Sequence, residues 1–166
     1  MIHMQTTFGT IVLQLDSKKA PKTVANFLQY VRDGFYDNTI FHRIIDNFVI
    51  QGGGFGPGMA QKAPRPPIEN EAANGLRNLR GAIAMARTSD PNSANSQFFI
   101  NVIDNDFLNY TAPTPSGWGY CVFGKVTDGL HVVDRIKGVP TGSRYGHKDV
   151  PVSDVLVESI KVVGAD

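Results

Sequence analysis

The chain has 166 residues, of which 42 % are hydrophobic, and its 16 Lys and Arg nearly balance its 15 Asp and Glu. This length fits a single domain, 1–166, with a sizeable core, and the balanced charge predicts no binding to nucleic acid or to an anionic membrane. No apolar run approaches the ~20 residues of a membrane helix, no basic leader precedes the first apolar positions, and Cys121 is the only cysteine, so we expect a protein of the cytoplasm.

Two segments are predicted as helices. In 20–34, Pro21 fits the first turn, where a missing N–H costs nothing, and apolar residues then recur at helical spacing. A second, shorter helix is predicted over 127–138, with Thr127 or Asp128 as its N-terminal cap and a narrow apolar stripe facing the core. Each segment ends at a glycine, as helices often do.

Most of the remaining chain consists of short apolar segments between Gly, Pro and Asn, which predicts β-strands. Such strands form a sandwich or a closed barrel, and we favour a mainly β closed barrel because two amphipathic helices need apolar surface to cover. The loop 52–80, dense in Gly and Pro, follows Gln51 directly, which indicates a binding surface. The predicted strands cover 10–15, 40–45, 48–51, 81–86, 97–102, 120–126 and 155–163.

Several common chemistries lack their residues. No Gly-Lys-Ser or Gly-Lys-Thr supplies a P-loop, and the glycines of GFGPGM end at Met59 rather than in a dinucleotide fingerprint. The four histidines are scattered without metal-ligand spacing, and no G-x-S-x-G elbow presents a serine nucleophile. We therefore expect no metal and no cofactor.

The stretch SQFFIN (96–101) indicates a groove. Strand alternation places Gln97, Phe99 and Asn101 on one face, where amides and an aromatic ring suit a partly solvated surface, and the other three residues on a core face. The alternative, that these are ordinary core and rim residues, stays open on pattern alone. The pocket hypothesis combines apolar Phe48, Val49, Phe107, Leu108 and Tyr120 with the hydrogen-bonding side chains of Arg43, Gln51, Arg87 and Gln97.

Five segments of the sequence, taken in their order and spacing, resemble those of a known protein family. They are FHRIIDNFVIQGGGF (41–55), AMAR (84–87), SQFFIN (96–101), DFLN (106–109) and GYCVFGKV (119–126). Together they resemble the signature segments of the cyclophilins, which are peptidyl-prolyl cis-trans isomerases, and the similarity covers essentially the whole chain. It is greatest to the short bacterial cytoplasmic type. The resemblance implies an eight-stranded antiparallel barrel closed by two helices, with proline-containing peptides and flexible protein segments as partners.

The resemblance also implies roles for individual residues. Arg43 would be the catalytic arginine, and Gln51 would place both the arginine and the substrate. Ala86 and Arg87 fall where the family binds the substrate backbone, and Gln97 falls on the groove wall. The proline ring would be held by Phe48, Val49, Phe99 and Leu108.

Four positions depart from the common family pattern. Val49 stands where methionine is frequent, Tyr120 where histidine is common, and Arg87 where asparagine is common. Phe107 replaces the tryptophan of cyclosporin-sensitive members, and because phenylalanine lacks the indole N–H donor we expect weak cyclosporin binding. None of these changes removes the arginine, the glutamine or the aromatic floor, so we expect an active enzyme.

The implied reaction explains why an arginine is needed. Rotation about an X–Pro bond faces a barrier of ~18–20 kcal/mol and breaks no bond, so it requires no nucleophile. A cation aimed at the prolyl nitrogen stabilises the twisted state, in which the lone pair is localised. Arginine does not titrate, so we expect activity to be flat from pH 6 to 8, and His42 would be the first suspect if it were not.

Two other functions use the same residues. A binding module would recognise proline segments with incidental isomerisation, and a chaperone would hold unfolded chains on a wider apolar surface. Catalysis should depend on Arg43, whereas holding should not. We expect a monomer, because the sequence shows no extra apolar stripe and no coiled-coil pattern.

Overall fold

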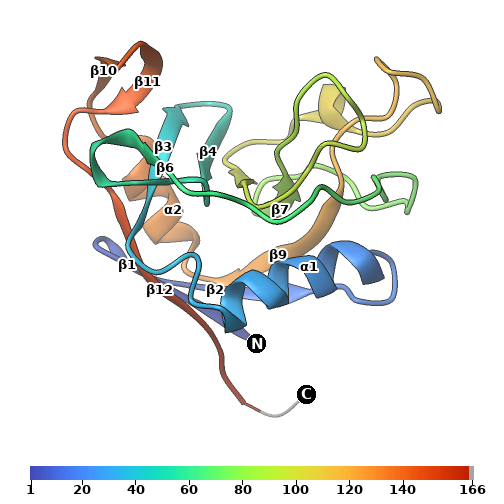
Figure 1. Cartoon of the computed structure of the whole chain (residues 1–166), viewed down its shortest axis with the longest axis horizontal. Helices are drawn as coiled ribbons and strands as arrows, with labels where there is room; N and C mark the ends of the chain where they lie inside the picture. The colour runs from blue at the N-terminus through green and yellow to red at the C-terminus, as the bar shows by residue number, and fades with distance from the viewer. Residues whose placement is uncertain (165–166) are drawn as a thin grey trace.

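The computed structural model describes residues 1–164, and eight of its strands close into one antiparallel barrel. Around the barrel the order is β1-β12-β3-β4-β8-β7-β9-β2, so the first and last strands pair with each other and the start of β1 lies beside the end of β12 (Figure 1). The mainly β closed barrel is therefore confirmed. The barrel strands are β1 (Ile2–Thr6), β2 (Gly9–Leu15), β3 (Thr39–Ile45), β4 (Val49–Gly52), β7 (Ala82–Met85), β8 (Phe98–Asn101), β9 (Val122–Asp128) and β12 (Leu156–Val162).

Some strands were not predicted from the alternation of apolar residues. β1 is one of them, because its five residues include only two apolar side chains, Ile2 and Met4. The hairpin of β10 and β11 is mostly polar on both faces, so it shows no alternation to read. These additional elements are β5 (Phe55–Gly56), η1 (Pro57–Met59), β6 (Ala60–Gln61), η2 (Asp106–Leu108), β10 (Thr141–Arg144) and β11 (His147–Pro151).

The core fills the inside of the barrel and continues under the first helix. Ile50 and Ile100 from neighbouring strands are fully buried, as are Phe98 and Phe123. The ring of Phe27, on α1, lies 5.8 Å from that of Phe98 and 5.2 Å from that of Phe123, between ring centroids. One helix thus closes the barrel with an aromatic side chain.

The helix α1 (Pro21–Arg32) begins at Ala20, whose side chain makes no capping hydrogen bond. Glu71 replaces that cap from far along the chain. Its Oε1 accepts the backbone N–H of Thr23 at 2.8 Å and the Thr23 hydroxyl at 2.7 Å. A carboxylate at a helix N-terminus is favourable, so this contact also holds the long loop 52–80 against the helix.

The helix α2 (Leu130–Lys137) begins differently from the prediction. Thr127 and Asp128 are the last residues of β9, and Gly129 occupies the N-terminal cap with φ +99°. A Cβ there would lie 2.5 Å from the carbonyl oxygen of Thr10, so the close approach of β2 requires glycine. The predicted side-chain cap is therefore wrong, because the strand continues up to the turn.

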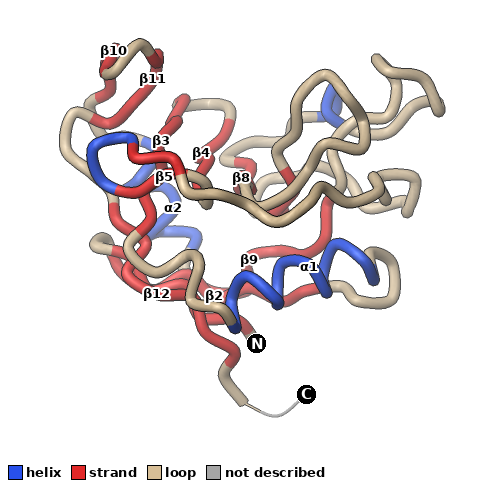
Figure 2. Tube along the Cα trace, in the orientation of Figure 1, coloured by secondary structure: helices blue, strands red, loops and turns tan. Residues whose placement is uncertain are grey.

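Much of the long loops lies on one side of the barrel, away from the β10–β11 hairpin (Figure 2). The β5–β6 part of the loop 52–80 is an exception and lies beside that hairpin, where the ring centroids of Phe55 and His147 are 5.9 Å apart. This loop, 52–80, contains the short β5–β6 hairpin and pairs with the loop 89–96 through a bridge between Ile68 and Ala94. Neither helix of residues 1–164 has the length and hydropathy needed to cross a bilayer.

Candidate active site

Arg43 lies on the outer wall of the barrel because β3 carries a bulge. In the register with β4, Phe41 pairs with Gly52 and Arg43 pairs with Gln51, so the ladder shifts by one residue around His42. Without that shift Phe41 and Arg43 would share a face. With it, Phe41 packs in the interior while Arg43 lines an outer cavity. A bulge that re-aims a side chain is common beside active sites.

The register of the strands β3, β4, β8 and β7 then places a row of paired residues beside Arg43. Gln51 pairs with Phe99, and Phe99 pairs with Ala84. Arg43 Nη1 donates to Gln51 Oε1 at 3.2 Å, and Gln51 Nε2 donates to Gln97 Oε1 at 3.0 Å. Within residues 1–164 no carboxylate forms an ion pair with Arg43. This chain of amides orients the guanidinium while leaving its charge available to a ligand.

The glycines after Gln51 make room for that chain of amides. A Cβ on Gly54 would lie 2.6 Å from Cγ of Gln97, a distance that real Cβ atoms do not reach. Only a residue without a side chain lets Gln97 lie flat beside β4 and reach Gln51. The glycine-rich stretch therefore serves close packing of the groove wall.

Beside Arg43 lies an apolar pocket of about 330 Å³. Val49, Phe99 and Leu108 form its buried floor. At its edge Phe48 stacks on Phe107 with ring centroids 5.7 Å apart, and Phe107 is 75 % exposed, so it forms the rim rather than the floor. The pocket is lined by Arg43, Phe48, Val49, Gln51, Ala86, Arg87, Phe99, Phe107, Leu108 and Tyr120.

Arg87 forms the opposite edge of the pocket. Its guanidinium lies 4.6 Å from the centroid of Tyr120, and Tyr120 in turn packs edge-on against Phe99 at 5.6 Å. Nε of Arg87 donates to the carbonyl of Gly119 at 2.8 Å and Nη1 to the carbonyl of Thr88 at 2.8 Å. These contacts hold the guanidinium flat on an aromatic face, where it is stabilised by a cation–π interaction.

A second cavity of about 240 Å³ adjoins the pocket and shares Gln51, Ala86 and Arg87 with it. Gln97 lines this second cavity rather than the first. Among residues 1–164, the charged residues that line it are Lys62 and Arg87, with no Asp or Glu. The two cavities thus meet at these three residues, and we call them together the proline groove, with one part lined mainly by apolar side chains and the other by polar and cationic ones.

Three buried asparagines hold the pocket walls and were not predicted to do so. Asn101 donates to Asn78 Oδ1 at 3.1 Å, and Asn105 donates to Asn101 Oδ1 at 2.8 Å. Asn105 also donates to the carbonyl of Phe48 at 3.0 Å, and Asn78 donates to that of Leu108 at 3.2 Å. Asn101 is fully buried, so its placement on a solvated groove face is wrong, although Phe99 beside it does border the pocket.

His42, next to the arginine, is buried and neutral at physiological pH. Burial lowers the pKa of His42 to about 4, with smaller contributions from His147 and Arg43. Its ring lies 4.5 Å from that of Phe55, and Nδ1 has no hydrogen-bond partner within residues 1–164. A group that is neutral down to about pH 4 does not titrate between pH 6 and 8. In the described part of the chain, no three His, Cys, Asp or Glu side chains cluster as metal ligands would.

Comparison with known proteins agrees with this geometry. The family model described as "Cyclophilin type peptidyl-prolyl cis-trans isomerase/CLD" matches residues 1–162. A peptidyl-prolyl cis-trans isomerase of Streptomyces antibioticus is 62 % identical over 163 residues, which cover 98 % of each chain. This chain belongs to the cyclophilin family. It is a cyclophilin-type peptidyl-prolyl cis-trans isomerase, and the family binds proline-containing peptides.

Two further proteins are similar to this chain over almost its whole length. Peptidyl-prolyl cis-trans isomerase B of Escherichia coli is 60 % identical over 162 residues, which cover 98 % of this chain and 99 % of the relative. A cyclophilin-type isomerase of Cryptosporidium parvum, crystallised in the presence of the dipeptide Ala-Pro, matches with a TM-score of 0.82 and 30 % identity. That match covers 99 % of each chain. The cyclophilin fold implied by the sequence is thereby confirmed.

The predicted site residues come together in this cyclophilin. All of them except Gln97 line the apolar pocket, and Gln97 is joined to it through Gln51. The asparagines at 78 and 105 were missed because short polar residues in loops usually signal turns. Their contacts give no local sequence signal, since they join positions up to 57 residues apart.

Proposed function

We propose that the pocket of about 330 Å³ holds the proline ring of a substrate while Arg43 acts on the prolyl nitrogen. The observation that carries this assignment is the hydrogen-bonded chain from Arg43 through Gln51 to Gln97 at the edge of an apolar floor. A fixed cation beside an apolar, ring-sized pocket is the arrangement that rotation about an X–Pro bond requires.

The mechanism follows from charge and shape. As the X–Pro bond twists, the nitrogen lone pair leaves the amide resonance and becomes a hydrogen-bond acceptor. Arg43 then interacts more strongly with the twisted state than with either planar state, so the barrier falls. Its planar fork remains charged and holds its direction through Gln51. No covalent bond forms or breaks, and no proton is transferred.

The remaining residues bind the substrate. Phe48, Val49, Phe99 and Leu108 would grip the ring and exclude water on one side, which strengthens the interaction of Arg43 in a lower dielectric. The backbone around Ala86 runs along the junction of the two cavities and would bind the substrate main chain. The groove is open at Phe107, so the residue before proline would be weakly selected.

A titration with an unlabelled Ala-Pro peptide, followed by ¹⁵N–¹H NMR, tests this placement. We expect the largest shifts at Phe48, Phe99 and Leu108 and at the Gln51 and Gln97 side-chain amides. Phe99→Ala should abolish the shifts, while Phe107→Ala at the exposed rim should only weaken them. Shifts centred elsewhere on the barrel, or binding unchanged in Phe99→Ala, would refute the assignment.

We also propose that this cyclophilin binds cyclosporin weakly. Phe107 is 75 % exposed at the rim and stacks on Phe48, so it presents a ring but no hydrogen-bond donor. Phe107→Trp should therefore tighten cyclosporin binding in a calorimetric titration and leave Ala-Pro binding nearly unchanged. Low-nanomolar binding by the wild type would contradict this proposal.

Finally, we propose that the chain acts as a single-domain monomer in the cytoplasm on proline-containing segments of flexible proteins. One barrel accounts for the fold, and the family model covers almost the entire sequence. Cys121, the only cysteine, is buried, and burial raises its thiol pKa to about 11, so it suits a reducing compartment without reacting there. Sedimentation analysis tests the monomer.

A further inference from the structure

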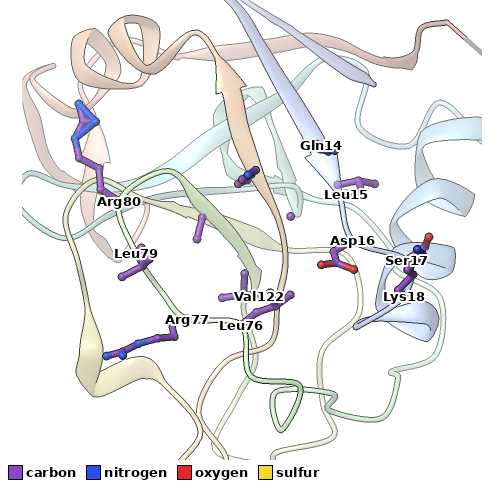
Figure 3. A pocket seen from close by; sticks show the side chains of 13 residues that line it. Gln14, Leu15, Asp16, Ser17, Lys18, Leu76, Arg77, Leu79, Arg80 and Val122 are labelled. Atoms are coloured by element: carbon purple, nitrogen blue, oxygen red, sulfur yellow. The ribbon is translucent and has the colours of Figure 1, made fainter. Parts of the chain in front are cut away.

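A second cavity lies outside the proline groove and has a different character. Its volume is about 590 Å³, against about 330 Å³ for the apolar pocket. Figure 3 shows one wall formed by the end of β2 and the turn after it, residues 14–18, and the other wall formed by residues 76–80. Val122 of β9 lies between the walls. We call this cavity the basic cleft.

The charged residues that line the basic cleft are mostly cations. Its lining holds the cations Lys18, Arg77, Arg80 and Lys125 and one acid, Asp16. Asp106 and Asp134 lie outside the lining and pair with the two arginines, so the excess positive charge of the cleft comes from Lys18 and Lys125. A cavity that concentrates one sign of charge attracts ligands of the opposite sign.

The cations are available to a ligand. Lys18 and Lys125 form no ion pair within residues 1–164. Arg77 pairs with Asp106 at 3.1 Å and Arg80 with Asp134 at 2.7 Å. Each of these four side chains is more than a third exposed, and exposed pairs contribute only about 0–1 kcal/mol, so either arginine can exchange partners.

The one acid of the lining is turned toward its own backbone. Asp16 Oδ1 accepts the backbone N–H of Lys19 at 3.0 Å, and the Asp16 carbonyl accepts that of Ala20. The carboxylate thus shapes the turn that leads into α1. It forms no ion pair with Lys18 or Lys125 in the described part of the chain.

The cleft also has an apolar surface. Leu79 is 46 % exposed although it is a large hydrophobic residue. Leu76 packs against a cluster of buried apolar residues that includes Val122 and Ala82. Leu79, Leu76, Val122 and Ala82 all line the cleft. A ligand that combines negative charge with an aliphatic side chain would match both parts of this lining.

We propose that the basic cleft binds an acidic polypeptide segment that carries aliphatic side chains. The volume exceeds what a single inorganic anion fills and lies within the roughly 300–1,000 Å³ of ligand pockets. No aromatic residue of the described part of the chain lines the cleft, so bases would find no ring on which to stack, which disfavours nucleic acid. A flat membrane surface cannot enter between two walls. The cleft thus offers a polypeptide a docking site separate from the proline groove.

The position of the cleft suits a protein that acts on polypeptides. Residues 76–80 separate it from the proline pocket, and Asn78, between Arg77 and Leu79, binds the carbonyls of Leu108 and Tyr120 on the pocket side. A chain with an acidic stretch and a proline would have two contact points on this protein. Linking two weak contacts in one chain raises the overall affinity.

A peptide without proline tests the cleft independently of the groove. The probe is a blocked peptide of alternating Glu and Leu, and its control carries Gln in place of every Glu. In ¹⁵N–¹H NMR at low salt, we expect the Glu probe to shift residues 14–18, 76–80 and Lys125, with affinity falling as salt rises. Equal shifts with the Gln peptide, or no shifts in these segments, would overturn the proposal.

Charge-reversal variants locate the binding. Lys18→Glu combined with Lys125→Glu should raise the Kd of the Glu probe about tenfold, because two exposed attractions to glutamates of the probe are lost and replaced by two repulsions. The matched control combines Lys148→Glu with Lys161→Glu, which changes net charge equally on other, exposed positions. It should leave the Kd nearly unchanged, and both pairs should keep wild-type exchange of an Ala-Pro peptide. An equal loss in both pairs would show attraction to net charge alone and would overturn the site.

Discussion

On the inner face of β4 and β8, Ile50 and Ile100 are fully buried among apolar side chains, whereas on the outer face Gln51 and Phe99 border an open groove. The inner face is held by packing, which follows from simple alternation. The outer face depends on a bulge at His42, on glycine at 54 and on bonds between amides. Stability and activity should therefore respond to different substitutions of neighbouring residues.

The largest effect on stability is expected on the inner face. Phe98→Ala removes a fully buried ring that contacts Phe27, Tyr36 and Phe41, and it should lower the free energy of unfolding by about 3–5 kcal/mol. Urea denaturation measures this loss. Phe107→Ala, at the exposed rim of the outer face, should change stability by less than about 0.5 kcal/mol. Equal losses in the two variants would erase the contrast between the faces.

The next effect concerns pH. The folded pKa of His42 is about 4 and its ordinary value is 6.5, so above pH 6.5 the ring is neutral in both states and full stability is present. As pH falls from 6.5 toward 4, only the unfolded chain takes up the proton, and about 3 kcal/mol of stability is lost. His42→Gln should flatten this slope in urea titrations, while His131→Gln, at an exposed position, should keep it. A slope that persists in His42→Gln would contradict the assignment.

A smaller effect is expected from the asparagines behind the pocket. Asn101→Ala leaves the buried Oδ1 of Asn78 without its donor and removes one of the two acceptors of the Asn105 amide, which should cost about 1–3 kcal/mol of stability. The amide signals of Phe48 and Leu108 should shift as well, because their carbonyls bind this network. The exposed substitution Gln14→Ala serves as the comparison. If Asn101→Ala changes neither the stability nor these amide signals, packing alone holds the walls of the pocket.

The smallest effect concerns selectivity in the groove. Lys62 and Arg87 face the second cavity without a lining carboxylate, so peptides with a glutamate near the proline should be favoured. One exposed pair supports a preference of roughly two- to fivefold in kcat/KM. Arg87→Asn should remove most of it, and Arg32→Asn on α1 should not. An unchanged preference in Arg87→Asn would assign selectivity elsewhere.

The sequence predicts those parts of this molecule in which a residue type has a single structural role, such as an apolar side chain that packs in the core. Alternation in 96–101 correctly places Phe98 and Ile100 inside, and seven of the eight barrel strands follow from similar patterns. The resemblance to cyclophilins supplied residues that the structure brings together around one pocket. The hydrogen bonds of the buried asparagines could not be predicted, because an asparagine that binds a distant carbonyl has the same sequence pattern as any turn residue. The same holds for Gly129, which is required by its φ of +99° and by the close approach of Thr10.

The most direct test is the rate of cis/trans exchange in an Ala-Pro peptide, measured by exchange NMR on the wild type, Arg43→Ala and Arg43→Lys. If Arg43 stabilises the twisted bond, Arg43→Ala should lose about 10²–10³-fold in rate while still binding the peptide and unfolding at the same urea concentration. Arg43→Lys should recover only part of the rate, because a point charge lacks the oriented fork. Exchange at the wild-type rate in Arg43→Ala would show that the pocket alone catalyses rotation and would contradict the central role of the arginine.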